Sequence, residues 1–131
     1  MAKTMARPAA KDLTDRELEI MHQFWKLNEA TVADVRDGLA ALGVELAQTT
    51  VGTLVRILHE KGFLEQTQVE RPARYKATRS FEDVSKNMVG DMLSRVFLGR
   101  PEQLLSCLFG DDRLSAKDRE RLLKMLKEET P

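Results

Sequence analysis

The chain has 131 residues, of which 42% are hydrophobic and 32% are charged, and its 21 basic and 21 acidic side chains leave no formal net charge. This composition excludes a wholly disordered chain, and no apolar run approaches the roughly 20 residues of a membrane helix. The first residues lack the apolar segment of a signal peptide, and one cysteine cannot form an internal disulfide. We therefore expect a cytoplasmic protein that does not bind membranes.

Residues 1–12 show no hydrophobic period and are interpreted as a mobile N-terminal arm. The first helix is predicted to begin at Thr14, because Thr14 and Glu17 have the T-x-x-E spacing of a capping box. Apolar residues then recur at helical spacing, and the helix is expected to end near Asn28.

A second helix is predicted after Thr31, which has Asp34 three residues further on, and Gly43 is a residue type that commonly ends a helix. Four apolar residues are expected to form the buried face of this helix: Val32, Val35, Leu39 and Leu42.

A third helix is predicted from about Gln48 to Lys61, followed by Gly62 as its stop. Its apolar residues fall at i, i+3, i+4 and i+7 and define the buried face: Val51, Leu54, Val55 and Leu58. The opposite face carries hydroxyl side chains near the N-terminus and a cation further along. Such a face suits DNA, because Thr can bond a phosphate or touch a thymine methyl, and Arg can bond a guanine edge or a phosphate. The candidate DNA-binding residues of this helix are Gln48, Thr49, Thr50, Thr53 and Arg56.

The hydrophobic period changes after Gly62. Residues 63–69 and 74–78 have the composition of short strands joined by a turn, which predicts a β-hairpin. Three helices followed by a hairpin is the order of a winged helix-turn-helix domain, predicted here over residues 13–79. The hairpin would contact phosphates or the minor groove through its basic residues. These residues are Arg71, Arg74 and Lys76.

The zero net charge hides an uneven distribution. Residues 46–79 carry six Lys or Arg against three Glu, hence +3, whereas residues 80–131 carry nine basic against ten acidic residues, hence −1. The basic excess therefore coincides with the third helix and the hairpin, as in a nucleic-acid-binding surface. Because the excess is small, we expect affinity for DNA to depend on dimerisation.

Residues 80–131 are predicted to form three further helices, the first capped by Ser80 and Asp83, the second opened by Pro101 and the third capped by Ser115. Three short helices make a poor core at this size, so a second copy is expected to cover their apolar surplus in a homodimer. The residues assigned to this dimerisation domain are Val84, Met88, Met92, Val96, Leu104, Leu108, Leu122 and Leu126.

Signatures of catalysis are absent. The chain has no Gly-rich phosphate loop, G-x-S-x-G, H-E-x-x-H or C-x-x-C motif, and His22 and His59 share no ligand spacing with Cys107. The sequence therefore predicts no catalytic residues, no cofactor and no metal site. Cys107 lies in the apolar run LLSCLF and is expected to be a buried small hydrophobe.

The run LTDRELEIMHQFWKLNEATVADV, followed by TTVGTLVRILHEKGFLE and then RPARYKA, resembles the penicillinase- and methicillin-resistance repressor family (BlaI/MecI type) from Leu13 to about Leu126. The resemblance implies a winged-helix head, a C-terminal dimerisation region of three helices, and a palindromic operator with thymine- and adenine-rich half-sites. It also implies derepression by a regulatory protease that cuts within the C-terminal helices. The residues to which it assigns the recognition-helix and wing roles are Thr49, Thr50, Thr53, Arg71 and Arg74.

The chain departs from the family pattern in four respects. Gly52 stands where some relatives carry a basic or amide side chain, and the arginine is at Arg56 where relatives often have it one position later, at Ile57. The candidate cleavage site matches Cys107–Leu108, which differs from the Asn-Phe bond of the best-known members. Paired copper-binding cysteines are missing. The resemblance thus gives no support to lactam-driven induction or copper sensing.

The expected fold is mostly α with a small β-hairpin wing: a winged helix-turn-helix head and a helical C-terminal dimerisation domain. The predicted function is repression by a homodimer bound to double-stranded operator DNA. Two alternatives stay open. A winged-helix protein–protein interaction module would show exposed apolar residues on the outward face, at whose margin Ile57 lies. A one-component regulator would hold a small ligand in a pocket between head and tail, for which the sequence identifies no polar residue set.

Overall fold

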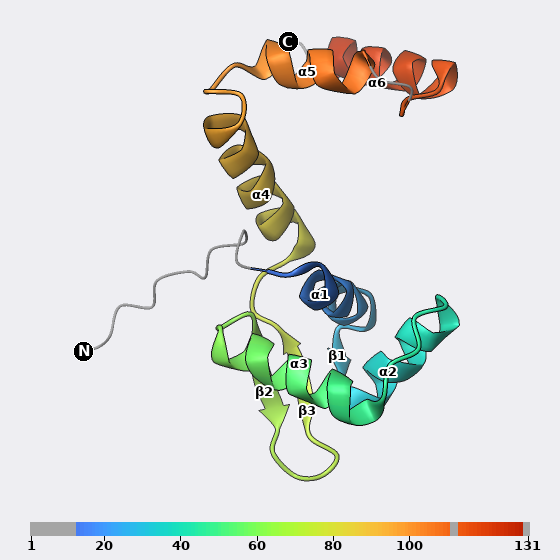
Figure 1. Cartoon of the computed structure of the whole chain (residues 1–131), viewed down its shortest axis with the longest axis vertical. Coiled ribbons are helices and arrows are strands. Elements are labelled where there is room, and N and C mark those ends of the chain that lie inside the picture. Colours follow the sequence, from blue (N-terminus) through green and yellow to red (C-terminus); the bar gives the residue numbers. More distant parts are fainter. Residues whose placement is uncertain (1–12, 111–112, 130–131) are drawn as a thin grey trace, which may run out of the picture. The chain divides into compact units, whose positions relative to one another are not determined.

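The computed structural model describes residues 13–110 and 113–129. The chain forms two compact units, one extending to Met88 and the other beginning at Val89 (Figure 1). The predicted N-terminal arm lies outside the described residues. Within the described ranges, the helices are too short or too polar to cross a membrane.

Two capping boxes start the first two helices. Helix α1 (Asp15–Leu27) begins at Thr14, whose backbone N–H donates to Glu17 Oε1 at 2.9 Å while the Glu17 N–H donates to Thr14 Oγ1 at 3.1 Å. Helix α2 (Val32–Ala41) begins at Thr31, which exchanges the same two hydrogen bonds with Asp34 at 3.0 and 3.1 Å. The side chains thus satisfy backbone donors that a helix leaves unpaired, and both predicted starts are confirmed.

Helix α3 (Gln48–Glu60) completes the helix-turn-helix, and glycines end α2 and α3. Gly43 has φ +87° and Gly62 has φ +88°, in the left-handed region where a side chain would be strained. Gly43 turns the chain so that the Val44 N–H donates back to the Leu39 carbonyl at 2.9 Å. Both predicted helix ends are therefore confirmed.

The predicted hairpin consists of β2 (Leu64–Gln68) and β3 (Arg74–Ala77), and it belongs to a three-stranded antiparallel sheet of order β1-β3-β2. The extra strand, β1 (Glu29–Ala30), lies between α1 and α2 and pairs Ala30 with Tyr75. The sequence did not predict β1, because two residues cannot show a period. It joins the wing to the helix-turn-helix.

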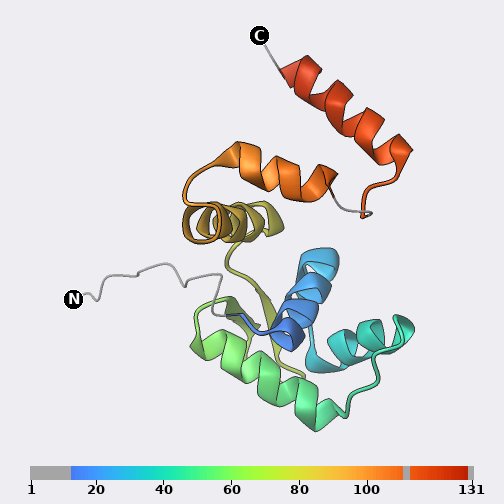
Figure 2. The same cartoon turned by 45° about the horizontal axis from the view of Figure 1, so that its top comes forward.

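Thirteen buried apolar side chains form one core, and all of them belong to the unit that ends at Met88. Figures 1 and 2 show α1, α2 and α3 gathered together in this unit. Its residues are Leu13, Ile20, Met21, Phe24, Ala30, Val35, Leu39, Val51, Val55, Leu58, Phe63, Leu64 and Val84. Leu42, predicted to be buried with Val35 and Leu39, is 68% exposed. That prediction is wrong, because α2 ends at Ala41 and the turn carries Leu42 outward.

Helix α4 (Phe81–Arg95) begins where the sequence predicts, with the Asp83 N–H donating to Ser80 Oγ at 3.0 Å. Its first turns belong to the head. Val84 is 1% exposed within the core, and Met88 packs against that core. Val84, which the sequence assigned to the dimer face, therefore has no free surface to offer a second chain.

The second unit contains the end of α4 and helices α5 (Pro101–Phe109) and α6 (Ala116–Glu129). Pro101 is at the start of α5, and the Asp118 N–H donates to Ser115 Oγ at 3.1 Å at the start of α6, as predicted. No side chain is buried among residues 89–110 and 113–128. Cys107 is exposed, so the prediction of a buried cysteine is wrong: the apolar residues beside it in the sequence do not cover it within one chain.

Candidate nucleic-acid interface

Helix α3 presents a polar face opposite its buried stripe. Val51, Val55 and Leu58 are buried on the inner side, and this fixes the orientation of the outer side. The side chains predicted for DNA contact on this helix are all exposed: Gln48, Thr49, Thr50, Thr53 and Arg56. Ile57 is half-buried, and Gly52 has no side chain and lies beside Val32 of α2. Neither residue therefore places a fully exposed apolar side chain on this polar face.

The hydroxyl of Thr53 already has an acceptor. Thr53 Oγ1 donates to the carbonyl oxygen of Thr49, one turn earlier, at 3.0 Å. This bond turns the hydroxyl toward the helix and leaves the side-chain methyl group and the oxygen lone pairs for a ligand. Thr53 is therefore suited to touch a thymine methyl or to accept a hydrogen bond from a base.

Arg56 forms an ion pair on the same face. Its Nη1 lies 3.1 Å from Glu60 Oε2, one turn further along, and both side chains are about three-fifths exposed (62% and 61%). Exposed pairs of this kind contribute little to stability. Arg56 can therefore exchange Glu60 for a phosphate or a guanine edge at small cost, and Glu60 holds the guanidinium on the outer face until then.

A groove separates α3 from the wing. It has a volume of about 520 Å³ and brings together Gln48 at the start of α3 and Arg71 at the tip of the hairpin. Tyr75 and the first residues of α2, Thr31 to Ala33, complete its wall with Pro72 and Ala73. The sequence predicted Gln48 and Arg71 but missed Tyr75, since a lone aromatic residue in a short strand is more typical of a core position.

Arg74 lies close enough to the start of α2 to act on Asp34. The hydrogen bonds from the Thr31 backbone and hydroxyl, followed by the positive charge of Arg74, hold the pKa of Asp34 below its ordinary value. Arg71 and Gln48 thus border the groove, and the charge of Arg74 acts at the start of α2, which forms one of the groove's walls. The cations come from the wing, and the hydroxyl and amide groups come from α3.

Lys76 is not on that surface. In the register of the sheet it stands between Glu29 of β1 and Glu65 of β2, and its Nζ lies 3.7 Å from Glu65 Oε1. The Glu65 carboxylate offsets part of its charge, and Glu29 is its partner in the register of the neighbouring strand. The structure therefore separates Lys76 from Arg71, with which the sequence grouped it.

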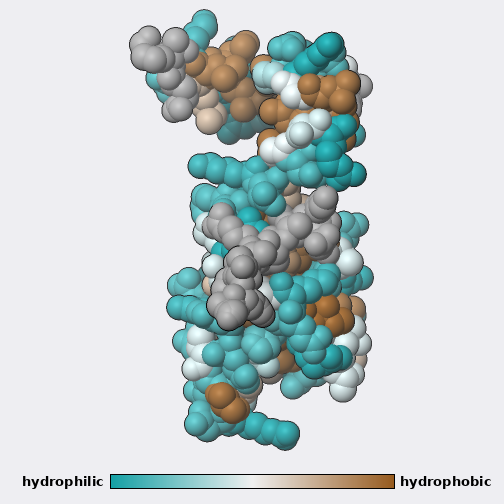
Figure 3. All heavy atoms as spheres, turned by 90° about the vertical axis from the view of Figure 1, so that its left-hand side faces the viewer, coloured by the Kyte–Doolittle hydropathy of each residue, from teal (hydrophilic) through white to brown (hydrophobic). Residues whose placement is uncertain are grey.

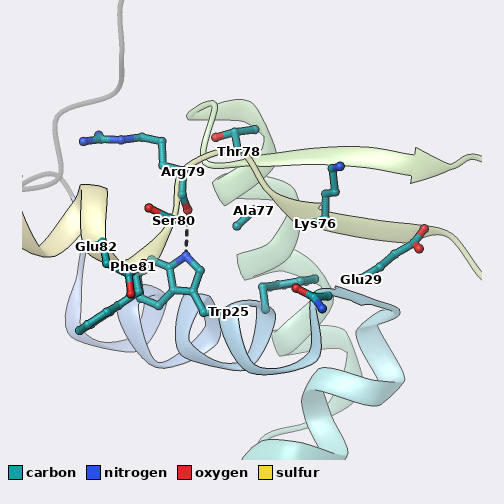
Figure 4. A pocket seen from close by; sticks show the side chains of 11 residues that line it. Trp25, Glu29, Lys76, Ala77, Thr78, Arg79, Ser80, Phe81 and Glu82 are labelled. Atoms are coloured by element: carbon teal, nitrogen blue, oxygen red, sulfur yellow. Dashed lines mark hydrogen bonds between the residues drawn. The ribbon is translucent and has the colours of Figure 1, made fainter.

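Lys76 instead lines a second pocket, of about 610 Å³, at the N-terminal end of α4 (Figure 4). Here Trp25 Nε1 donates to the Arg79 carbonyl oxygen at 2.9 Å, and the Trp25 and Phe81 rings meet edge-on with centroids 5.4 Å apart. These contacts anchor the start of α4 to α1. They belong to the junction of α4 with the head and not to the groove beside α3.

A partly buried ion pair fixes the C-terminal end of α3. Lys61, which follows the last helical residue, places its Nζ 2.9 Å from Oε1 of Glu17, whose side chain is only 4% exposed. Burial works to raise the pKa of Glu17, but hydrogen bonds from Lys61 and Thr14 outweigh it, so this pKa lies below its ordinary value of 4.5. The same carboxylate thus caps α1 and holds the C-terminal end of α3.

A helix-turn-helix followed by a hairpin with arginines at its tip defines the winged-helix class of DNA-binding regulators. The chain belongs to the penicillinase repressor family, whose model matches residues 13–128. It is therefore a DNA-binding transcriptional repressor, and the resemblance found in its sequence is confirmed. No curated protein sequence matches the chain.

Solved structures share the fold. The complex structure of hsRosR-S4 has a TM-score of 0.56 at 17% identity, covering 93% of this chain and 93% of that chain. The complex structure of hsRosR-SG has a TM-score of 0.53 at 18% identity, covering 92% and 94%. The oxidised form of MarR from E. coli has a TM-score of 0.50 at 17% identity, covering 95% and 81%. The predicted fold, a winged-helix head with a helical C-terminal part, is confirmed.

Proposed function

We propose that this repressor acts as a homodimer on a palindromic operator, with α3 of each head in the major groove and the wing arginines on the neighbouring phosphates. The exposed Thr and Arg face of α3, set beside Arg71 across a groove, carries this proposal. A protein–protein interaction module would instead present exposed apolar side chains on this face. Ile57, the apolar residue at its margin, is half-buried and so gives that alternative little support. Two identical heads related by a two-fold axis read two half-sites about one helical turn, or a multiple of it, apart.

The second unit supports the homodimer because it has no core of its own. Its apolar side chains include Met92 at 43%, Val96 at 66% and Leu126 at 49% exposure. Figure 3 shows apolar surface concentrated over the part of the chain that holds α5 and α6. Large apolar side chains exposed together in this way mark an interaction site. A second copy is the partner that closed two-fold symmetry favours. The dimer surface that we propose comprises Met92, Val96, Leu104, Leu108, Leu122 and Leu126.

Derepression by proteolysis would act on this unit. The candidate cleavage site, Cys107–Leu108, lies near the end of α5, and both side chains are exposed. A cut there separates α6 from α5 and so divides the proposed dimer surface. A regulatory protease that recognises this helix is thus part of the proposal, and the local helix must unwind for the bond to enter an active site.

Selection of bound duplexes from a random-sequence library tests the proposed function. The full chain is expected to enrich an inverted repeat and to bind it with two chains per duplex, as measured by sedimentation. Enrichment of no sequence, or of a single half-site bound by one chain, would contradict the proposal. DNase footprinting of the DNA that flanks the gene then locates the natural operator.

Replacing Arg56 by Ala is expected to weaken binding to the selected operator roughly fivefold. A base-contacting arginine typically supplies about 1–3 kcal/mol, and we expect the low end because Arg56 must first leave Glu60. Fluorescence anisotropy at constant salt measures the effect. Arg16→Ala, which removes another exposed arginine paired within its own helix, is the matched control. Equal affinities for the two variants would remove Arg56 from the interface.

Replacing both Arg71 and Arg74 by Ala is expected to make DNA binding less dependent on salt concentration. Removing one phosphate-binding cation should lower the slope of log affinity against log salt by about one unit, so we expect a decrease of about two for the double variant. Lys76→Ala is the control within the same hairpin. Its slope should equal that of the wild type, because Glu29 and Glu65 flank Lys76. A decrease for Lys76→Ala and none for the arginine variant would reverse the assignment.

A further inference from the structure

An arginine outside the recognition helix holds the first side chain of that helix. Arg36 of α2 donates from Nη1 to Gln48 Oε1 at 2.8 Å. Nη2 and Nε of the same guanidinium lie 3.0 and 3.2 Å from Oδ1 of Asp37. Arg36 thus spans two acceptors, one on its own helix and one on α3. No sequence pattern predicts this interaction, since the two residues are far apart along the chain and lie on different helices.

The chemistry of arginine fixes the orientation of the Gln48 amide. A guanidinium carries only donors, so the amide atom that faces Arg36 must be the oxygen. The Nε2 group then points away from Arg36, and it has no hydrogen-bond partner among the residues that the structure describes. Gln48 is exposed and lines the groove between α3 and the wing. It therefore offers that groove its N–H donors, while Arg36 takes one of the two lone pairs of its oxygen and fixes the orientation of the amide.

Glutamine usually reads adenine with both halves of its amide. The oxygen accepts from adenine N6 while the nitrogen donates to N7. Arg36 takes one of the two lone pairs of that oxygen and holds the amide in one orientation, with its N–H groups turned away from Arg36. Guanine, which presents N7 and O6, and thymine, which presents O4, offer acceptors to the remaining N–H groups without requiring the oxygen. We infer that Arg36 is a positioning residue: by holding the Gln48 amide in one orientation, it favours a base that presents acceptors, guanine or thymine, over adenine at the position that Gln48 faces.

The geometry also distinguishes this role from a simple phosphate contact. The edge of the Arg36 guanidinium that carries Nε and Nη2 already faces Asp37, whose negative charge offsets that of the arginine. Nη1 is turned toward Gln48. A phosphate would have to displace one of these two acceptors, whereas the base of the operator approaches Gln48 without disturbing either.

This inference rests on the proposed function, and one experiment tests both separately. Bound duplexes are selected from a random-sequence library with the full-length wild type and with Arg36→Ala, Arg36→Lys, Gln48→Ala and Arg16→Ala. Loss of base preference in Gln48→Ala identifies the base pair that Gln48 reads. At that base pair, Arg36→Ala is expected to raise the ratio of adenine to guanine or thymine about tenfold, because the released amide can turn both its oxygen and its nitrogen toward adenine. Arg36→Lys retains a donor-only partner and is expected to keep the wild-type preference, and Arg16→Ala controls for the removal of a positive charge.

The outcomes separate the two hypotheses. If the wild type enriches no sequence, the proposed function fails. A second outcome is that the wild type enriches a site, whereas Arg36→Ala keeps the same base preferences and binds all sequences more weakly by the same factor. Arg36 then contacts the DNA backbone, and the inference is overturned. It is also overturned if Gln48→Ala changes no base preference, since Gln48 then reads no base.

Discussion

Ending the chain after Met88 is expected to leave a folded, monomeric head that binds the operator at least about a hundredfold more weakly than the full chain. All buried apolar residues of the described chain lie within this fragment, so it retains its core. The loss of affinity follows from linkage: two heads joined in a dimer turn the second binding event into an intramolecular one, which typically contributes a factor of about 10² to 10⁴. Sedimentation and a gel-shift titration measure the two expected changes.

A shorter truncation, after Arg79, is the matched comparison. It removes Val84 from the core and Asp83 from its 2.7 Å ion pair with Arg79, whose side chain is only 6% exposed. Loss of a buried aliphatic side chain and of a partner to a buried charge both destabilise a fold. We therefore expect this fragment to melt at a lower temperature than the one ending at Met88. If the fragment that ends at Met88 is a dimer, or binds the operator as tightly as the full chain, residues 89–131 do not mediate dimerisation.

Local signals in the sequence were sufficient to predict the helices and the hairpin. The Thr14–Glu17 and Thr31–Asp34 capping boxes are short-range chemistry that the structure reproduces bond by bond. Gly43 and Gly62 end α2 and α3 because their φ values favour glycine. The polar face of α3 also follows from periodicity, since placing the buried stripe inward leaves the threonines outward.

Contacts between distant segments could not be predicted in this way. Strand β1 exists only because β3 pairs with it. Lys76 has the charge of a DNA contact, yet its neighbours across the sheet, Glu29 and Glu65, become visible only in the strand register. The exposure of Cys107 has a similar origin, because an apolar run predicts burial without saying whether the same chain or another one provides the cover.

Replacing Lys61 by Met is expected to destabilise the head by about 2 kcal/mol at neutral pH. Removing one partner of a fully buried ion pair costs about 3–5 kcal/mol, and we expect less because the Lys61 side chain is 33% exposed and solvent can reach Glu17 in part. Met retains most of the aliphatic length of lysine, so the loss reports the charge. Chemical denaturation measures it, with Lys86→Met on the exposed surface of α4 as the control. If both variants unfold at the same denaturant concentration, the pair does not stabilise the head.

The dependence on pH identifies Glu17 as the group responsible. Its pKa is lower in the folded head than its ordinary value of 4.5, so the stability that it contributes is present above that value and is lost as the pH falls through the folded pKa. The difference between wild type and Lys61→Met should therefore be largest near neutral pH and shrink as the pH falls from 4.5 toward the lowered folded pKa of Glu17, where the carboxylate becomes protonated in the wild type as well. Adding Glu17→Gln to Lys61→Met should recover part of the lost stability, since an amide can still accept from the Thr14 N–H without leaving a buried charge unpaired. A difference that stays constant with pH, or a double variant less stable than Lys61→Met, would mean that Lys61 acts through packing. In that case the carboxylate would cap α1 without holding the end of α3.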